Sequence, residues 1–71
     1  MLNKKDKWLE FIDAATPEMS EHTRKFVHKQ VSVIHDSEKS PDNRLRAAEN
    51  VVFLLTGYMR TQADKQETAD A

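Results

Sequence analysis

Residues 40–59 read SPDNRLRAAENVVFLLTGYM and predict a long amphipathic helix. Ser40 offers a hydroxyl for an N-cap, Pro41 suits the first helical position, and Asp42 places a carboxylate near the positive end of the helix. Apolar side chains then recur at helical spacing and fan over about half of the helix circumference. Because so wide a stripe indicates contacts on more than one side, we expect this helix to be the central one. The stripe comprises Leu45, Ala47, Ala48, Val51, Val52, Leu54, Leu55, Tyr58 and Met59.

The preceding sequence predicts two further helices. The tripeptide Thr-Pro-Glu at residues 16–18 repeats the pattern of hydroxyl, proline and carboxylate, which predicts a second helix start at residue 17. Apolar stripes of period 3.6 run through both flanking segments. Two helices joined by a short loop favour an antiparallel hairpin, with the first helix laid across it. We therefore predict an all-α, three-helix chain with helices near residues 4–15, 17–36 and 41–62.

The length of the chain, 71 residues, limits it to one small domain. A domain of this size hides only about 60% of the surface that its unfolded chain exposes, so its core is thin. The sequence has no cysteine, and its three histidines are scattered, so neither a disulfide nor a metal is expected to stabilise it. We expect a helical-bundle homodimer. The domain is expected to span residues 1–61, followed by a polar C-terminal tail at 62–71 that is frayed or disordered.

Phe53 breaks the pattern of the third helix because the wheel places it away from the main apolar stripe. Gly57 follows one turn later, and a glycine inside a helix costs about 1 kcal/mol relative to alanine, which suggests close approach by another group. Aromatic and arginine side chains are common anchors of protein interfaces. Phe53 could belong to the core, to a dimer seam or to a partner surface. The predicted interface residues are Asn50, Phe53, Gly57, Arg46, Arg60 and Tyr58, with Thr61 extending the seam.

Charge is balanced along the chain, with 11 basic and 12 acidic residues and a formal net charge of -1. Such a balance gives little long-range attraction for nucleic acids or anionic membranes. Small basic clusters can still contact phosphates, and dimerisation would double them. A dimeric DNA-binding transcriptional regulator is therefore the alternative function, and a structural subunit of a larger assembly is another. The candidate nucleic-acid contacts are Arg24, Lys25, Lys29 and Arg44.

The chain shows no pattern of catalytic, cofactor-binding or metal-ligating residues. His22, His28 and His35 are six and seven residues apart, rather than at the i, i+4 spacing that lets two imidazoles reach one ion, and we interpret them as solvated. No glycine-rich loop or nucleophile with a neighbouring base is evident. We expect neither an enzyme nor a cofactor.

The longest apolar run, residues 51–55, is far shorter than the roughly 20 residues needed to span a bilayer. The charged N-terminal residues leave no apolar segment for a signal peptide, so we expect a cytoplasmic protein. The sequence thus favours a non-catalytic protein–protein interaction module. We expect a small stoichiometric regulator, adaptor or inhibitor of a partner protein, and a bacterial or phage origin.

Overall fold

The computed structural model describes the backbone of residues 3–70 and the side chains of residues 3–66. It contains three helices and, within this part of the chain, no strand. They are α1 (Lys4–Ala15), α2 (Glu21–Ile34) and α3 (Pro41–Asp70). The predicted all-α, three-helix chain is confirmed, and α1 has the predicted bounds.

The start of α2 differs from the prediction because Ser20, and not Thr16, is its N-cap. The Ser20 hydroxyl accepts a hydrogen bond of 3.2 Å from the backbone N–H of Thr23. Thr16 is buried, and its hydroxyl instead donates to the carbonyl of Ile12 at 2.7 Å, so it closes the end of α1. The backbone N–H of Met19 donates to the carbonyl of Thr16 at 3.1 Å, which makes residues 16–19 a turn with proline in its favoured second place. Helix α2 therefore begins at residue 21 rather than 17, and it ends at 34 rather than 36.

Helix α3 begins where the sequence predicts but runs further. The Ser40 hydroxyl accepts a hydrogen bond of 3.2 Å from the backbone N–H of Asn43, as an N-cap does. The helix ends at Asp70 rather than near residue 62. The extra length is consistent with a segment that has no glycine or proline and is rich in alanine, lysine, glutamine and glutamate, which are good helix formers. Fraying of the 62–71 tail stays a prediction; Ala71 and the side chains of residues 67–70 lie outside the described residues.

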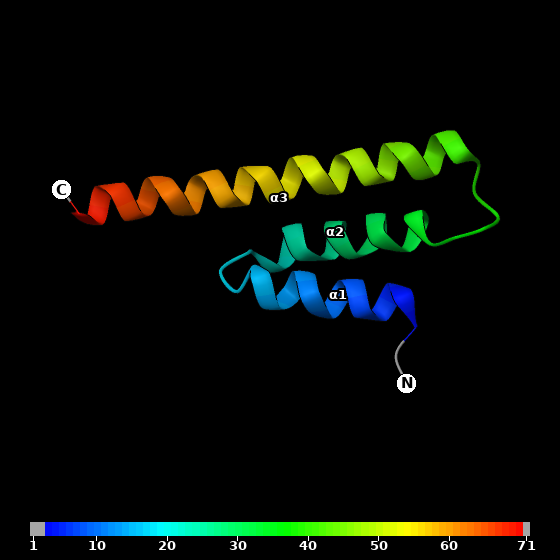
Figure 1. Ribbon diagram of the computed structural model, residues 1–71, viewed down its shortest axis with the longest axis horizontal. Coiled ribbons are helices and arrows are strands. Elements are labelled where there is room, and N and C mark those ends of the chain that lie inside the picture. Colours follow the sequence, from blue (N-terminus) through cyan, green and yellow to red (C-terminus); the bar gives the residue numbers. More distant parts are fainter. Residues whose placement is uncertain (1–2, 71) are drawn as a thin grey trace.

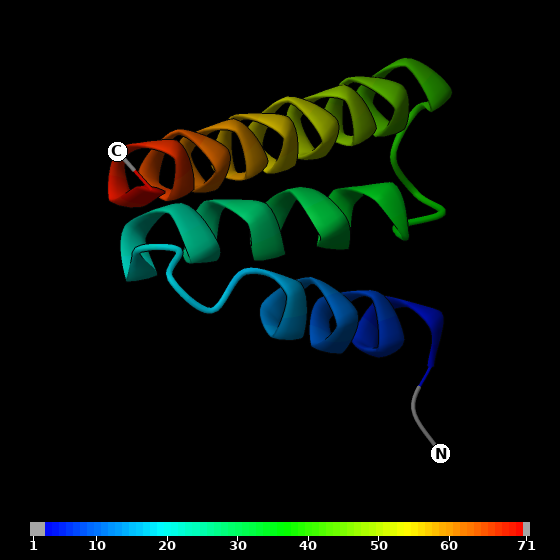
Figure 2. The same cartoon turned by 60° about the vertical axis from the view of Figure 1, so that its left-hand side comes forward.

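The three helices lie side by side, with α2 between α1 and α3 (Figures 1 and 2). Helices α2 and α3 form the predicted antiparallel hairpin, and their contact is the most extensive between helices of the described residues. The prediction that the third helix is central is wrong, because the two fully buried side chains, Val27 and Val31, both belong to α2. Helix α1 lies along α2 instead of across the hairpin, since Asp13 binds two side chains of α2 and Trp8 packs on His35 at its end.

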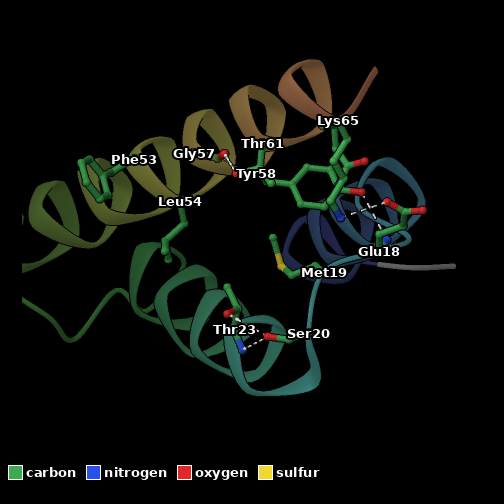
Figure 3. A pocket seen from close by; sticks show the side chains of 11 residues that line it. Glu18, Met19, Ser20, Thr23, Phe53, Leu54, Gly57, Tyr58, Thr61 and Lys65 are labelled. Carbon is green, nitrogen blue, oxygen red and sulfur yellow. Dashed lines mark hydrogen bonds and ion pairs between the residues drawn. The ribbon is translucent and has the colours of Figure 1, made fainter. Parts of the chain in front are cut away.

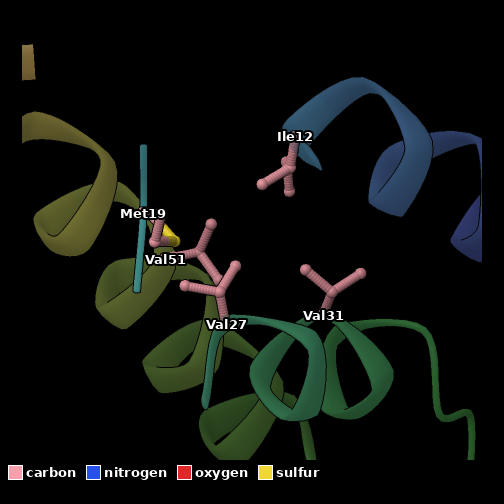
Figure 4. Close-up of a cluster of buried hydrophobic side chains, with 5 residues drawn as sticks. All are labelled: Ile12, Met19, Val27, Val31 and Val51. Atoms are coloured by element: carbon pink, nitrogen blue, oxygen red, sulfur yellow. The ribbon is translucent and has the colours of Figure 1, made fainter. Parts of the chain in front are cut away.

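The buried core is small and draws on all three helices (Figure 4). The molecule extends 49, 29 and 17 Å along its three principal axes, so the helices form a flat arrangement. Such a flat arrangement can bury only a narrow strip of side chains. Among the described residues, no helix has the length and apolar character needed to cross a membrane. The core cluster consists of Ile12, Met19, Val27, Val31 and Val51.

Candidate interaction surfaces

Phe53 lies at the surface of α3, with 79% of its area exposed. The possibility that Phe53 belongs to the core of its own chain is therefore wrong. Apart from its two chain neighbours and the adjacent backbone of its own helix, a methyl group added at Gly57 would meet no atom of the described residues within 4 Å. Packing inside this part of the chain thus gives no reason for the glycine. Glycine still lowers the stability of the helix relative to alanine, because its helix propensity is lower.

A hollow of about 370 Å³ opens beside Phe53, between α3 and the turn that precedes α2 (Figure 3). Phe53, Gly57 and Tyr58 follow one another along its α3 wall, and Met19 and Leu54 provide its apolar base. The Tyr58 hydroxyl accepts a hydrogen bond of 3.2 Å from the backbone N–H of Glu18, which fixes the turn against α3. The remaining lining residues are polar: Glu18, Ser20, Thr23, Thr61, Gln62 and Lys65.

The other predicted interface residues lie outside this hollow. Asn50 is half-buried, and its amide donates to Gln30 Oε1 at 3.2 Å, so it links α3 to α2. Arg46 and Arg60 are exposed on α3 but do not line the hollow. The structure thus brings three of the six predicted residues together: Phe53, Gly57 and Tyr58.

A second apolar surface lies between α1 and α3. A groove of about 390 Å³ runs between these helices, and a hollow of about 530 Å³ continues along α3. Val52 lines both, so the two form one surface. The sequence places the apolar side chains of this surface, other than Phe53, on the apolar stripes of the two helices, which predicts that they are buried. The groove is lined by Lys7, Trp8, Phe11, Ile12, Val51, Val52 and Leu55, and the hollow by Leu45, Ala48, Glu49, Val52, Phe53 and Thr56.

Asp13 on α1 forms the main polar link between α1 and α2. Its Oδ1 lies 2.8 Å from both Arg24 Nη1 and His28 Nε2. Partial burial alone would raise the pKa of Asp13, but hydrogen bonds and charges from His28 and Arg24 outweigh this effect and lower it. When Asp13 is ionised, its contacts with Arg24 and His28 therefore stabilise the packing of α1 against α2.

Two of the four candidate nucleic-acid contacts are engaged within the chain. The Arg24 side chain is only 15% exposed and also donates to the backbone carbonyls of Thr16 and Met19. Arg44 Nε donates to the carbonyl of Ile34 at 2.9 Å, which caps the end of α2. Lys25 and Lys29 remain exposed on α2. Arg24 and Arg44 thus have hydrogen-bond partners within the chain, which leaves fewer basic side chains available to contact a phosphate.

The histidines differ from their predicted solvated state at two of three positions. His22 is exposed, whereas His28 binds Asp13 and His35 packs edge-on against Trp8 with ring centroids 5.0 Å apart. The His35 Nδ1 also lies 3.1 Å from the carbonyl of Val31. Within the described residues, no group of three or more histidines or carboxylates is placed to hold a metal ion. The spacing of the histidines could not predict the contacts of His28 with Asp13 and of His35 with Trp8, because these contacts depend on how α1 packs against α2.

No protein-family model matches the chain, and no curated protein or solved structure matches it at a significant level. The fold and its function are therefore interpreted from the chain's own residues. The two apolar surfaces are its most informative features, because exposed contiguous apolar patches on small proteins commonly mark interaction sites.

Proposed function

We propose that the chain is a non-catalytic protein–protein interaction module that binds a partner protein through the hollow beside Phe53. It would act stoichiometrically, as a regulator, adaptor or inhibitor, and we place it in the cytoplasm. The observation that carries the proposal is a largely exposed phenylalanine at the edge of a hollow whose glycine has open space above it. Aromatic anchors beside a pocket are typical of the energetic centres of protein interfaces.

The hollow beside Phe53 has an apolar base and a polar rim, as the centres of protein interfaces do. Met19 and Leu54 give an apolar base, and Tyr58 adds an aromatic wall whose hydroxyl is already held by the Glu18 backbone. The polar rim can satisfy a partner's backbone groups, as interface rims commonly do. Lys65 Nζ and Glu18 Oε2 lie 3.9 Å apart across one end, so the rim carries both signs of charge. A partner that inserts one apolar side chain beside Phe53 fits this layout.

The test is affinity capture with the full chain as bait, followed by mass spectrometry of the captured proteins. We expect a specific protein to be retained by the native chain and lost, by at least about tenfold, with Phe53→Asp or Thr61→Asp. Phe53→Leu should retain much of the binding because it keeps an apolar side chain at the edge of the hollow. Ser32→Asp, which adds the same charge at an exposed site on α2, is the matched control.

Two outcomes would contradict the proposal. One is capture that is equal for the native chain and for both hollow variants. The other is salt-sensitive binding to duplex DNA in an electrophoretic shift at low salt, abolished by Lys25→Glu combined with Lys29→Glu, since this would favour the DNA-binding alternative. Circular dichroism of each variant shows that a loss of binding does not come from unfolding.

A further inference from the structure

The open face formed by α1 and α3 exposes several large apolar side chains close together. Phe11 is 75% exposed and Val52 64% exposed, although both lie on the apolar stripes of their helices. Leu45 and Met59 lie two turns before and after Val52 and are similarly exposed. We call this surface the α1/α3 face and define it by Trp8, Phe11, Leu45, Val52 and Met59.

The exposed area of the α1/α3 face approaches the area that each partner buries in a stable dimer. Its five side chains together expose roughly 600 Å² of largely apolar surface, taking about 150–250 Å² for a large side chain in full. A stable protein interface buries about 800 Å² on each partner. The face supplies the apolar centre of such an interface, and the polar residues around it would supply the remainder.

The thin core indicates that this face is covered whenever the chain is folded. The buried apolar side chains of the described residues are Ile12, Met19, Val27, Val31, Ala47 and Val51. A single core in a chain of this size rarely supplies enough stability without a further staple, and the sequence has no cysteine. If the chain needs a partner on this face in order to fold, that partner must be present wherever the chain is synthesised. A second copy of the chain is always present there.

We infer that a second copy of the chain covers the α1/α3 face, with a two-fold axis parallel to the helices. Helices α1 and α3 run in the same direction on either side of α2 (Figures 1 and 2). This axis therefore lays α1 of each copy along α3 of the other copy, and Phe11 enters the hollow at Val52. The interface is isologous, so every contact occurs twice.

Charge at the edges of the face fits this arrangement. Lys7 stands at the α1 edge of the groove, and Glu49 stands at the α3 edge of the adjoining hollow, one turn before Val52. Residues 7–12 of α1 and residues 51–55 of α3 line the same groove, so the two-fold axis brings Lys7 of one copy toward Glu49 of the other. Opposite charges meet at both edges of the dimer.

The decisive test is the oligomeric state of the full chain by sedimentation equilibrium at micromolar concentrations. We expect the native chain to be a dimer. Val52→Asp should weaken dimerisation by at least about a hundredfold, because each interface then buries two unpaired carboxylates. Thr61→Asp on the opposite side of α3 and Ser32→Asp on α2 add the same charge and should leave the dimer intact.

Charge reversal tests the arrangement without placing a charge in the apolar centre. Lys7→Glu alone and Glu49→Lys alone should each weaken the dimer by about threefold to thirtyfold, as expected for two exposed ion pairs. An equimolar mixture of these two variants should form a heterodimer nearly as tight as the native dimer, because both edge pairs become complementary again. This mixture also decides the question if Val52→Asp fails to fold.

Three results would overturn the inference: a monomeric native chain, an assembly larger than a dimer, or a mixture no tighter than either charge variant alone. The first would leave the face to a different protein. Phe53 lines both the hollow beside it and the hollow at Val52, whereas Thr61 lines only the first and therefore separates the two proposals. Loss of capture with Thr61→Asp and loss of the dimer with Val52→Asp are separate readouts, so either proposal can fail without the other.

Discussion

Asp13 on α1 lies 2.8 Å from the guanidinium of Arg24 on α2, and this ion pair orients α1. Because Asp13 faces α2, the neighbouring Phe11 points away from it, and 75% of its surface is exposed. Ile12 lies between these positions and enters the core. The polar contact thus fixes one side of α1 to the hairpin and presents its aromatic side beside α3.

Replacing Asp13 with asparagine is expected to lower the stability of the chain at neutral pH by about 1 kcal/mol, allowing for the partial exposure of the site. The pKa of Asp13 in the folded chain lies below its ordinary value of 3.8, so its contribution to stability is fully present above pH 3.8. That contribution is lost as the pH falls through the lower, folded pKa. Urea unfolding between neutral pH and pH 2 should therefore show a smaller acid loss for Asp13→Asn than for the native chain.

Glu10→Gln is the matched control for this measurement. Glu10 is an exposed carboxylate on the same helix, and its replacement removes the same charge without touching Arg24 or His28. We expect its pH profile to follow that of the native chain. Equal acid sensitivity of Asp13→Asn and the native chain would show that the carboxylate does not stabilise the docking of α1.

Gly57→Ala separates the stability of the chain from its binding. Since a methyl group at this site has open space among the described residues, alanine should raise the free energy of unfolding by about 0.5–1 kcal/mol through its higher helix propensity. The same methyl group narrows the hollow beside Phe53 and should weaken partner capture. Thermal unfolding measures the first effect and affinity capture the second. A more stable variant that binds its partner as well as the native chain does would place the partner elsewhere.

The fold could largely be predicted from local signals, and the errors come from tertiary contacts. Ser40 has the N-cap role that its neighbours Pro41 and Asp42 indicate. Thr16 has the same sequence pattern, yet its hydroxyl is drawn to the Ile12 carbonyl and the Arg24 side chain. No local signal distinguishes the two motifs, because the difference depends on which helix the hydroxyl finally meets.

The helical wheel also could not predict which helix lies between the other two. The wheel shows that α3 has the widest apolar stripe, and this width predicts a central place for the helix. The stripe is wide because one part, around Val51, packs on α2 while another part, around Val52, stays open. The angle of Phe53 on the wheel shows that it lies off the main stripe but leaves open whether it is buried. The groove beside Phe11 was not predictable, since it depends on how α1 is docked.

Ser20→Ala tests the revised start of α2. Removing a serine N-cap typically costs about 1 kcal/mol, because the N–H of Thr23 loses its acceptor. Chemical denaturation should show this loss, whereas Ser37→Ala in the exposed loop before α3 should leave the unfolding midpoint nearly unchanged. Equal effects of the two substitutions would indicate that Ser20 does not cap the helix.

Val31→Ala and Val52→Ala compare the core with the α1/α3 face through the same loss of two methyl groups. Val31 is fully buried in the core of each chain, so its truncation should cost about 2 kcal/mol at every protein concentration. Val52 is largely exposed within one chain and becomes buried only in the dimer that we infer. The native unfolding midpoint should therefore rise with protein concentration, and Val52→Ala should reduce that rise while Val31→Ala leaves it in place. A native midpoint that is independent of concentration, together with a negligible effect of Val52→Ala, would show that the face is not covered by a second copy.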